Sequence, residues 1–239
     1  MLIYQPQNGY CYNSDTHFLY NFITIALKKY KNIQGDLLDI GSGSGILGLL
    51  VVREYSNLVL NQCELQDVFC FLTNKNSQIN NTPNTLFQGD FLDISFNKTF
   101  SYIVSNPPFY HSDVIKTDKK NIKIARYNDF MPLELFIQKV SKLLNHNGKF
   151  IFCYDVKQLN DIMIYLKKYK LNIEIIQFLH PNIKKEATLV MIYAKKNSKS
   201  LLKIIPPLIM FDENNKFSTT VEDIYEKSAT HSIKCDLNI

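Results

Sequence analysis

Residues 37–50 read LLDIGSGSGILGLL: an apolar run, a glycine-rich loop and an apolar stretch with helical spacing. The run that ends at Ile40 is typical of a strand buried on both faces of a sheet. Gly41, Gly43 and Gly45 let the backbone turn sharply and approach a ligand closely. The helix that follows offers free N–H groups at its start. Because open α/β sheets bind ligands at the carboxyl ends of their strands, this stretch predicts a ligand site.

Strand and helix patterns alternate on both sides of this loop, which favours an α/β fold with helices on both faces of a mostly parallel seven-stranded sheet. The strands are expected at 35–40, 58–64, 84–90, 100–106, 148–155, 171–181 and 186–196. The helices are expected at 17–30, 46–55, 67–80, 133–145 and 156–169. The last two strands are too close in sequence for a crossover helix, so they should form a terminal antiparallel hairpin.

The overall composition narrows the class of protein. The 239 residues, 46% hydrophobic and 21% charged, suit one soluble domain with a full core. Five scattered cysteines without a CxxC pair argue against a metal site and for a reducing cytoplasm. No run approaches the roughly 20 apolar residues of a membrane span, and no signal peptide is evident. The net charge of +5 is compatible with phosphate contacts to nucleic acid, although an Asn-, Lys- and Ile-rich composition explains it equally well.

Acidic residues lie at the ends of three successive predicted strands. Asp39 would repel a pyrophosphate, and it suits the cationic methionine portion of S-adenosylmethionine. Glu64 can accept both hydroxyls of a ribose. Asp90 can accept a hydrogen bond from an adenine amino group, with Phe91 against the ring. The predicted cofactor-binding residues are Asp39, Gly41, Ser42, Gly43, Gly45, Glu64, Leu65, Asp90, Phe91 and Asn106. The loop also satisfies the GxGxxG pattern of dinucleotide sites through Gly43, Gly45 and Gly48, which leaves an NAD-binding oxidoreductase as an alternative.

The segment YIVSNPPFY (102–110) carries the second chemical signal. Pro107 and Pro108 stiffen the backbone and remove two N–H donors after a buried strand. The Asn106 side-chain oxygen and the Pro107 carbonyl can then accept both hydrogens of a planar NH2 group and free its lone pair. Phe109 can stack on the substrate, and positioning supplies much of the rate. We therefore predict Asn106, Pro107, Pro108 and Phe109 as catalytic; a rigid loop without function is the alternative.

In this order, DIGSGSG (39–45) and SNPPF (105–109) resemble the motif pair of S-adenosylmethionine-dependent amino-nitrogen methyltransferases, over about residues 35–195. The resemblance implies a Rossmann-like class I methyltransferase fold and S-adenosylmethionine as the cofactor. We accordingly expect an N-terminal arm and helix (1–34) packed on the core, a methyltransferase domain (35–200), and a C-terminal extension of the same domain (201–239).

Further residues resemble one subgroup, the tRNA1(Val) (adenine(37)-N6)-methyltransferases. They are Gln7, Gly9, Tyr10, Tyr12, Asp15, Ala125, Arg126, the NGK triplet at 147–149 and PLIMFDENNKFS at 207–218. Cys11, where the family favours a basic residue, and the region 110–128 depart from it. The resemblance implies N6-methylation of adenine in RNA, in the tRNA anticodon loop at position 37. A single-stranded loop suits this because its bases unstack at little cost.

Substrate contacts are expected from the N-terminal arm and from the basic segment after the proline motif. The residues are Tyr10, Tyr12, Asp15, Lys119, Lys120, Lys123 and Arg126, with Lys116 beside them. A packing role for the arm and a solvated lid for the basic segment are the alternatives. The partner is expected to be tRNA or another RNA, in the cytoplasm and without membrane contact. The sequence does not give the oligomeric state, and a monomer is favoured.

Three other functions stay open at this point. Ribosomal guanine-N2 methyltransferases and protein glutamine-N5 methyltransferases use the same motif pair, because they face the same planar NH2. The glutamine enzymes usually carry a large N-terminal helical domain, which 34 residues cannot supply. A non-catalytic RNA-binding module is the third, although the intact Asn106 and Asp39 argue against it.

Overall fold

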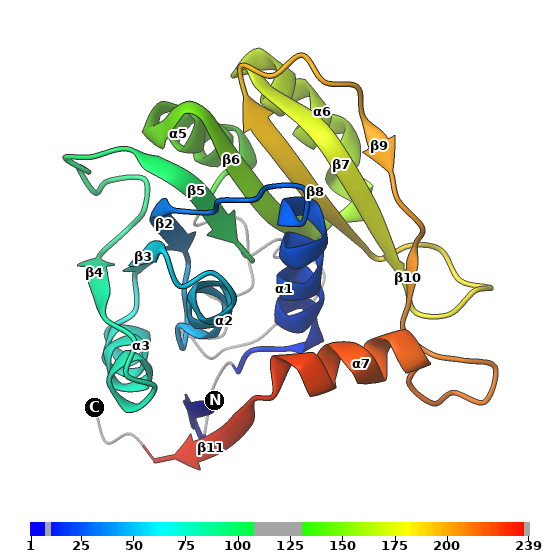
Figure 1. The fold of residues 1–239 in the computed structure, drawn as a ribbon, viewed down its shortest axis with the longest axis horizontal. Coiled ribbons are helices and arrows are strands. Elements are labelled where there is room, and N and C mark those ends of the chain that lie inside the picture. The colour runs from blue at the N-terminus through cyan, green and yellow to red at the C-terminus, as the bar shows by residue number, and fades with distance from the viewer. Residues whose placement is uncertain (8–10, 108–130, 237–239) are drawn as a thin grey trace.

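A computed structural model describes residues 1–7, 11–107 and 131–236 of the chain (Figure 1). Its main sheet has the strand order β10-β7-β8-β6-β5-β2-β3-β4, with β9 also paired to β7. The seven long strands are β2 (Gly35–Ile40), β3 (Leu58–Glu64), β4 (Asn84–Gln88), β5 (Phe100–Ser105), β6 (Leu144–Asp155), β7 (Leu171–His180) and β8 (Leu189–Lys196). All of them are parallel except β8, which is antiparallel to β6 and β7 on either side of it. This confirms the predicted parallel sheet and its antiparallel hairpin.

Over the described part of the chain, the main sheet has nine strands rather than the predicted seven. The two additional strands, β9 (Lys203–Ile204) and β10 (Leu208–Ile209), both lie parallel to β7 at the sheet edge. Pro206 and Pro207 separate them. Proline has no N–H to donate to a ladder, so these edge strands stay short.

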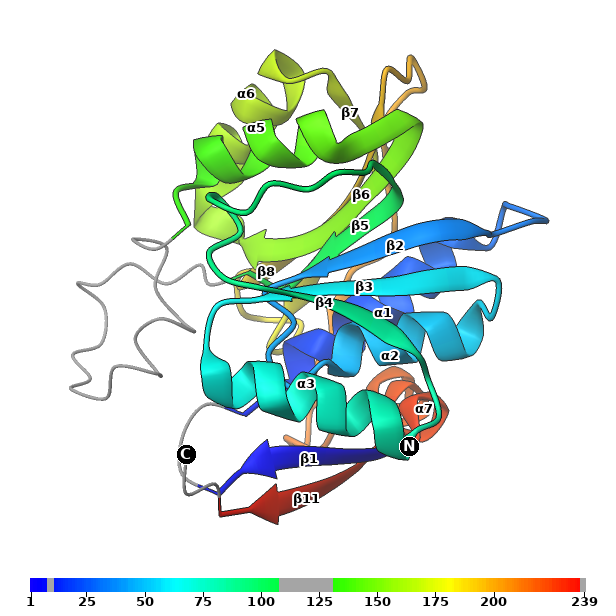
Figure 2. The same cartoon turned by 90° about the vertical axis from the view of Figure 1, so that its left-hand side faces the viewer.

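The helices cover both faces of the sheet (Figure 2). On one face lie α1 (Ser14–Leu27), α2 (Ile46–Glu54) and α3 (Asp67–Ile79), and on the other α5 (Leu133–Leu143) and α6 (Leu159–Lys168), which follows a 3-10 turn, η2 (Val156–Gln158). No helix within the described ranges combines the length and the apolar character needed to cross a bilayer.

Strand β5 occupies the middle of the sheet, hydrogen-bonded to β2 on one side and β6 on the other. Its residues Ile103, Val104 and Ser105 are at most 1% exposed. The Asn-Pro segment that follows therefore leaves a central strand, not an edge strand. This segment therefore begins next to the glycine loop, which follows the neighbouring strand β2.

Several predicted boundaries differ from the structure. Helix α1 begins at Ser14 and ends at Leu27, three residues earlier at each end than expected. Strand β4 ends at Gln88, because Gly89 leaves the extended conformation with a φ of 137°. Strand β6 begins earlier than predicted, since Leu144 already pairs with Phe100 of β5.

A second, two-stranded sheet joins the ends of the chain, and no sequence pattern predicted it. Strand β1 (Leu2–Pro6) runs parallel to β11 (His231–Cys235), and helix α7 (Thr219–Ser228) packs against α1. The amino group of Met1 donates to the Ala229 carbonyl at 2.8 Å, and the His231 N–H donates to the Met1 carbonyl at 2.8 Å. The C-terminal extension thereby holds the N-terminal arm beside α3, as Figure 2 shows.

Candidate functional site

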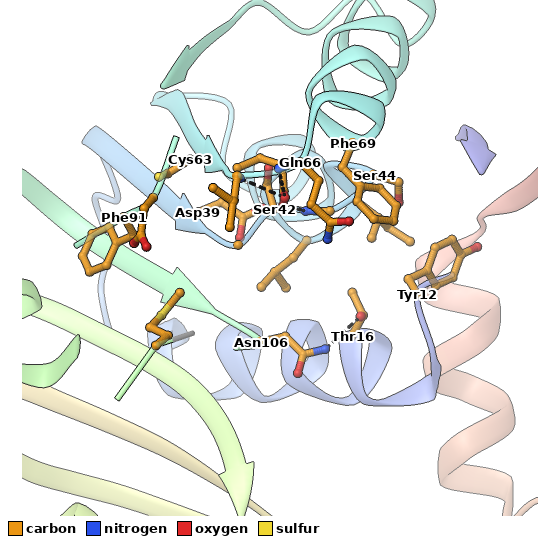
Figure 3. Close-up of a pocket in the computed structure, with 18 of the residues that line it drawn as sticks. Tyr12, Thr16, Asp39, Ser42, Ser44, Cys63, Gln66, Phe69, Phe91 and Asn106 are labelled. Carbon is orange, nitrogen blue, oxygen red and sulfur yellow. Dashed lines mark hydrogen bonds between the residues drawn. The ribbon is translucent and has the colours of Figure 1, made fainter. Parts of the chain in front are cut away.

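A pocket lies at the carboxyl ends of the central strands (Figure 3). The glycine loop lines one side of it, while Thr16 of α1 and Asn106 after β5 lie next to each other on the opposite side. The lining residues are Tyr12, Thr16, Asp39, Gly41, Ser42, Gly43, Ser44, Ile46, Leu47, Cys63, Glu64, Leu65, Gln66, Phe69, Gly89, Asp90, Phe91, Asn106 and Met131. The structure thus brings together residues that the sequence places on six separate segments.

The glycine loop takes a conformation that requires glycine. Gly41 and Gly43 have φ angles of 67° and 55°, in the left-handed region that other residues rarely adopt. A Cβ atom at either position would have no atom of the described residues within 4 Å. These two positions therefore face open space beside the pocket, and the constraint on them is the backbone conformation.

Polar side chains of α3 and β3 fasten this loop from behind. The Thr73 hydroxyl donates to the Gly43 carbonyl at 2.7 Å, and the Asn76 amide donates to the Ser44 carbonyl at 2.8 Å. Asn76 also exchanges two hydrogen bonds with the Tyr4 backbone of β1, at 2.7 and 3.0 Å. The loop and the N-terminal strand are therefore held by the same buried side chain. Gly45 does not line the pocket; it lies at the start of α2 with a φ of 83°.

Asp39 lies at the floor of the pocket and is 1% exposed. Its Oδ2 accepts a hydrogen bond from the Gly48 N–H at 2.9 Å. Burial raises the pKa of this carboxyl to about 7, and the charge of Glu64 adds to the increase, while the bonds from Gly48 and Gln62 oppose it. A cation bound next to Asp39 would favour its ionised form.

Glu64 ends β3 as predicted and is 6% exposed. Its Oε2 accepts from the Gly43 N–H at 2.8 Å, and its Oε1 accepts from the Leu65 and Gln66 N–H groups at 2.9 Å each. Burial raises its pKa, and these three bonds oppose the increase. Neither Asp39 nor Glu64 belongs to an ion pair among the described residues. Two buried carboxyls without a cationic partner suit a cationic ligand with hydroxyl groups.

Asp90 was predicted to end β4, but the strand ends at Gln88, and Asp90 lies two residues after it. Its Oδ1 accepts from the Leu92 N–H at 2.8 Å and so closes the turn after Gly89. Phe91 is 3% exposed, lines the pocket and packs against Phe96 and Phe136. This region provides an apolar end to the pocket.

Lys139 of α5 anchors the turn that carries Asp90 and Phe91. Its Nζ donates to the Leu92 and Ile94 carbonyls at 2.9 and 2.6 Å, and lies 5.2 Å from the centre of the Phe91 ring. Partial burial lowers its pKa. The ring is thus fixed from the side of α5, which leaves its position in the pocket well defined.

Asn106 is bound at both ends of its amide. Its Nδ2 donates to the Thr16 Oγ1 at 3.2 Å, and its Oδ1 accepts from the Cys153 Sγ at 3.0 Å. Pro107 is buried and does not line the pocket. The structure places Asn106 in the same pocket as Asp39, Glu64 and the glycine loop.

The other predicted substrate residues are only partly described. Tyr12 lines the pocket, and its hydroxyl is hydrogen-bonded to Ser232 of β11 at 2.7 Å. Asp15 is not a lining residue; it accepts from the Asn13 side chain at 2.8 Å, and burial raises its pKa. The predicted residues that lie outside the described ranges are Gly9, Tyr10, Pro108, Phe109, Lys116, Lys119, Lys120, Lys123, Ala125 and Arg126.

Nine lining residues were not predicted from the sequence: Thr16, Ser44, Ile46, Leu47, Cys63, Gln66, Phe69, Gly89 and Met131. Gln66 Oε1 is buried and has no hydrogen-bond partner among the described residues, as expected of a group that binds a ligand. Its position two residues after Glu64 was the available signal for it. Thr16 had one as well, because it directly follows Asp15 in the N-terminal motif.

The pocket fits S-adenosylmethionine in chemistry as well as in place. Asp39 matches the cationic methionine portion, Glu64 and the unpartnered Gln66 oxygen match ribose hydroxyls, and Phe91 matches an adenine ring. A dinucleotide fits less well, because its pyrophosphate would meet two carboxyls here. Within the described ranges, no group of three or more His, Cys, Asp or Glu side chains is arranged to hold a metal ion.

The curated relatives are named as RNA methyltransferases. The chain is 27% identical over 154 residues to a tRNA1(Val) (adenine(37)-N6)-methyltransferase of Pedobacter heparinus, which covers 63% of this chain and 64% of the relative. It is 29% identical over 141 residues to the protein of the same name from Porphyromonas gingivalis, covering 56% and 55%. The matched part thus spans only about half to two thirds of these relatives.

Solved structures with this fold are also methyltransferases. A predicted O-methyltransferase from Agrobacterium tumefaciens has a TM-score of 0.67 at 15% identity and covers 92% of this chain and 99% of its own. A T. Thermophilus 16S rRNA N2 methyltransferase in complex with AdoMet and guanosine has a TM-score of 0.56 at 17% identity, covering 78% and 44%. At these identities the likeness establishes the Rossmann-like class I fold.

The family profile of the methyltransferase small domain matches residues 22–159, which is more than half of the chain. This match includes the glycine loop, Glu64, Asp90 and Asn106, and it leaves the oxidoreductase alternative without support. The chain therefore belongs to the methyltransferase small domain family and carries an S-adenosylmethionine-dependent methyltransferase domain.

Proposed function

We propose that this protein methylates the N6 amino group of adenine in RNA, at position 37 of a tRNA anticodon loop. One observation carries the amino-nitrogen chemistry: the Asn106 amide, at the end of a central strand, lines the same pocket as Asp39 and the glycine loop. The relatives named as tRNA1(Val) (adenine(37)-N6)-methyltransferases support the choice of adenine and tRNA.

In this proposal the two sides of the pocket have different tasks. S-adenosylmethionine supplies a methyl group activated by its sulfonium. Asp39 binds the cationic methionine portion, Glu64 accepts from the ribose hydroxyls, and Phe91 lies against the adenine. Asp90 accepts from the adenine amino group. Gly41, Ser42, Gly43 and Gly45 shape the loop, and Leu65 adds apolar contact.

Asn106 orients the substrate amino group. Its Oδ1 has a second lone pair beyond the one used by Cys153, and this lone pair accepts one amino hydrogen. Pro107 is buried and is not a lining residue, but its backbone carbonyl directly follows Asn106, and we propose that this carbonyl accepts the other hydrogen. Pro108 and Phe109 complete the motif by stiffening the loop and stacking on the base. The nitrogen lone pair would then attack the methyl carbon while the bond from this carbon to the sulfonium breaks. S-adenosylhomocysteine would leave, and the nitrogen would lose one proton to solvent. Orientation, rather than a strong base, supplies the rate.

The remaining assignments belong to the same proposal. Tyr10, Tyr12 and Asp15 receive the substrate, and Lys116, Lys119, Lys120, Lys123 and Arg126 contact RNA phosphates. Residues 1–34 and 201–239 form one domain with the core at 35–200, since β1 pairs with β11 and α7 packs on α1. We place the protein in the cytoplasm. We also propose that it acts as a monomer, and analytical ultracentrifugation would test this oligomeric state.

The decisive assay offers three substrates in parallel with labelled S-adenosylmethionine: an unmodified tRNA1(Val) transcript, a ribosomal RNA fragment and a release factor. We expect label only in the tRNA, and mass spectrometry of its nucleosides to find N6-methyladenosine at position 37. N2-methylguanosine in ribosomal RNA would replace the proposal with the guanine alternative, and N5-methylglutamine with the protein alternative.

A further inference from the structure

The Asn106 amide is hydrogen-bonded to two side chains that lie far from it in the sequence. Thr16 is 90 residues away and lies in α1, and Cys153 is 47 residues away and lies in β6. Cys153 is fully buried and Thr16 is 4% exposed. Figure 3 shows Thr16 next to Asn106, facing the glycine loop across the pocket.

The two ends of an amide have opposite hydrogen-bonding character, since the oxygen only accepts and the nitrogen only donates. The proposed reaction needs the oxygen, because a substrate NH2 can only donate to Asn106. If the amide rotated by about 180°, its NH2 group would replace the accepting oxygen. The orientation of this one side chain therefore decides whether the site is competent.

The contacts around Asn106 favour the orientation seen here. The Cys153 sulfur approaches Oδ1 to 3.0 Å, a distance that fits a thiol donating to oxygen. Burial raises the pKa of this thiol well above its ordinary value, so it keeps its proton and remains a donor. The Thr16 hydroxyl can donate or accept, and here it accepts from Nδ2 at 3.2 Å.

We propose that Cys153 and Thr16 are positioning residues for Asn106: Cys153 sets the orientation of the amide by donating to its oxygen, and Thr16 holds the nitrogen end in place. Cys153 is not among the lining residues, so it acts through Asn106. The inference rests on the proposed function, in which the Asn106 oxygen accepts from the substrate amino group.

The test compares variants that remove a hydrogen-bonding group with variants that keep it. Cys153→Ala loses the donor and Cys153→Ser retains one; Thr16→Val loses the hydroxyl and Thr16→Ser retains it. With the tRNA1(Val) transcript and labelled S-adenosylmethionine, we expect kcat to fall about tenfold for the Ala and Val variants. The two Ser variants should stay within about threefold of wild type, because one hydrogen bond is preserved. The Kd for S-adenosylhomocysteine should change by less than about twofold in Cys153→Ala, since Cys153 does not line the pocket.

An Asn106→Asp background separates orientation from general packing. A carboxylate has an oxygen at both ends, so no orientation needs to be fixed. Adding Cys153→Ala to this background should lower kcat by less than about twofold, whereas a packing role would again cost about tenfold. If the Asn106→Asp rate is too low to follow, the comparison of Ser with Ala at position 153 decides.

Each failure has its own signature. An active wild type with unchanged kcat in Cys153→Ala and Thr16→Val, or a Cys153→Ser as impaired as Cys153→Ala, overturns this inference alone. A wild type that transfers no methyl to any amino nitrogen overturns the proposed function and this inference with it. If Cys153→Ala does not fold, as its melting temperature would show, the Thr16 pair carries the test.

Discussion

The two sides of the pocket are built in different ways. On the glycine-loop side, Asp39 and Glu64 accept hydrogen bonds from backbone N–H groups of Gly48, Gly43, Leu65 and Gln66, close to them in the fold. On the opposite side, the hydrogen-bond partners of the Asn106 amide among the described residues are the side chains of Thr16 and Cys153. Backbone contacts survive most substitutions and side-chain contacts do not. Damage on the first side should therefore appear in cofactor affinity, and damage on the second in turnover.

The largest effect is expected from Asn106→Ala, which removes the proposed acceptor of the amino hydrogens. We predict a fall in kcat of about 10²–10³-fold, the range seen when one group that stabilises a transition state is removed. The Kd for S-adenosylhomocysteine, measured by calorimetry, should stay within about twofold of wild type. Near-normal kcat in a folded Asn106→Ala variant would show that Asn106 does not orient the substrate. It would also contradict the proposal that the two sides of the pocket have different tasks.

Asp39→Asn tests the glycine-loop side. The amide oxygen can still accept from the Gly48 N–H, so the start of α2 keeps its hydrogen bond while the negative charge is lost. Loss of a charged hydrogen bond to the ligand should weaken cofactor binding by about 10–100-fold. Equilibrium binding of S-adenosylmethionine would measure this, and an unaltered Kd would exclude Asp39 from the site.

The pH dependence of binding sharpens the same point. The pKa of Asp39 in the free protein is raised to about 7, so the carboxyl is largely protonated at pH 6 and ionised at pH 8. Cofactor affinity should therefore rise about tenfold over this range, and Asp39→Asn should lose most of the rise. The raised pKa also means that Asp39 contributes stability below about pH 4, its unfolded pKa range, and that this contribution is lost as the pH rises through 7.

The smallest effect is expected from Ser232→Ala, which acts on the edge of the pocket. Ser232 is hydrogen-bonded to Tyr12 at 2.7 Å and accepts from the Gln5 amide at 2.7 Å. Because this contact is exposed, its loss should weaken S-adenosylhomocysteine binding by only about two- to threefold. A much larger loss in calorimetry would mean that the C-terminal strand is part of the cofactor site.

The same contrast explains what the sequence could predict. Asp39, the glycines and Glu64 lie within 26 residues of continuous strand-loop-helix pattern, where local spacing fixes their places. The Asn-Pro motif was readable because proline leaves few backbone options. Cys153 carries no motif, and the only signal for Thr16 is that it directly follows Asp15. The contact of both residues with Asn106 exists only once α1 and β6 have packed around β5. The β1–β11 sheet could not be predicted either, because two five-residue strands at opposite ends of the chain are too short to show a clear periodicity.

One measurement tests the central claim most directly: a crystal structure of the protein with S-adenosylhomocysteine and adenosine. The account predicts that the ligand sulfur lies between Asp39 and Asn106, and that the adenosine N6 lies within hydrogen-bond distance of the Asn106 Oδ1. Adenosine bound with its N6 away from Asn106, or S-adenosylhomocysteine bound outside the glycine-loop pocket, would contradict it.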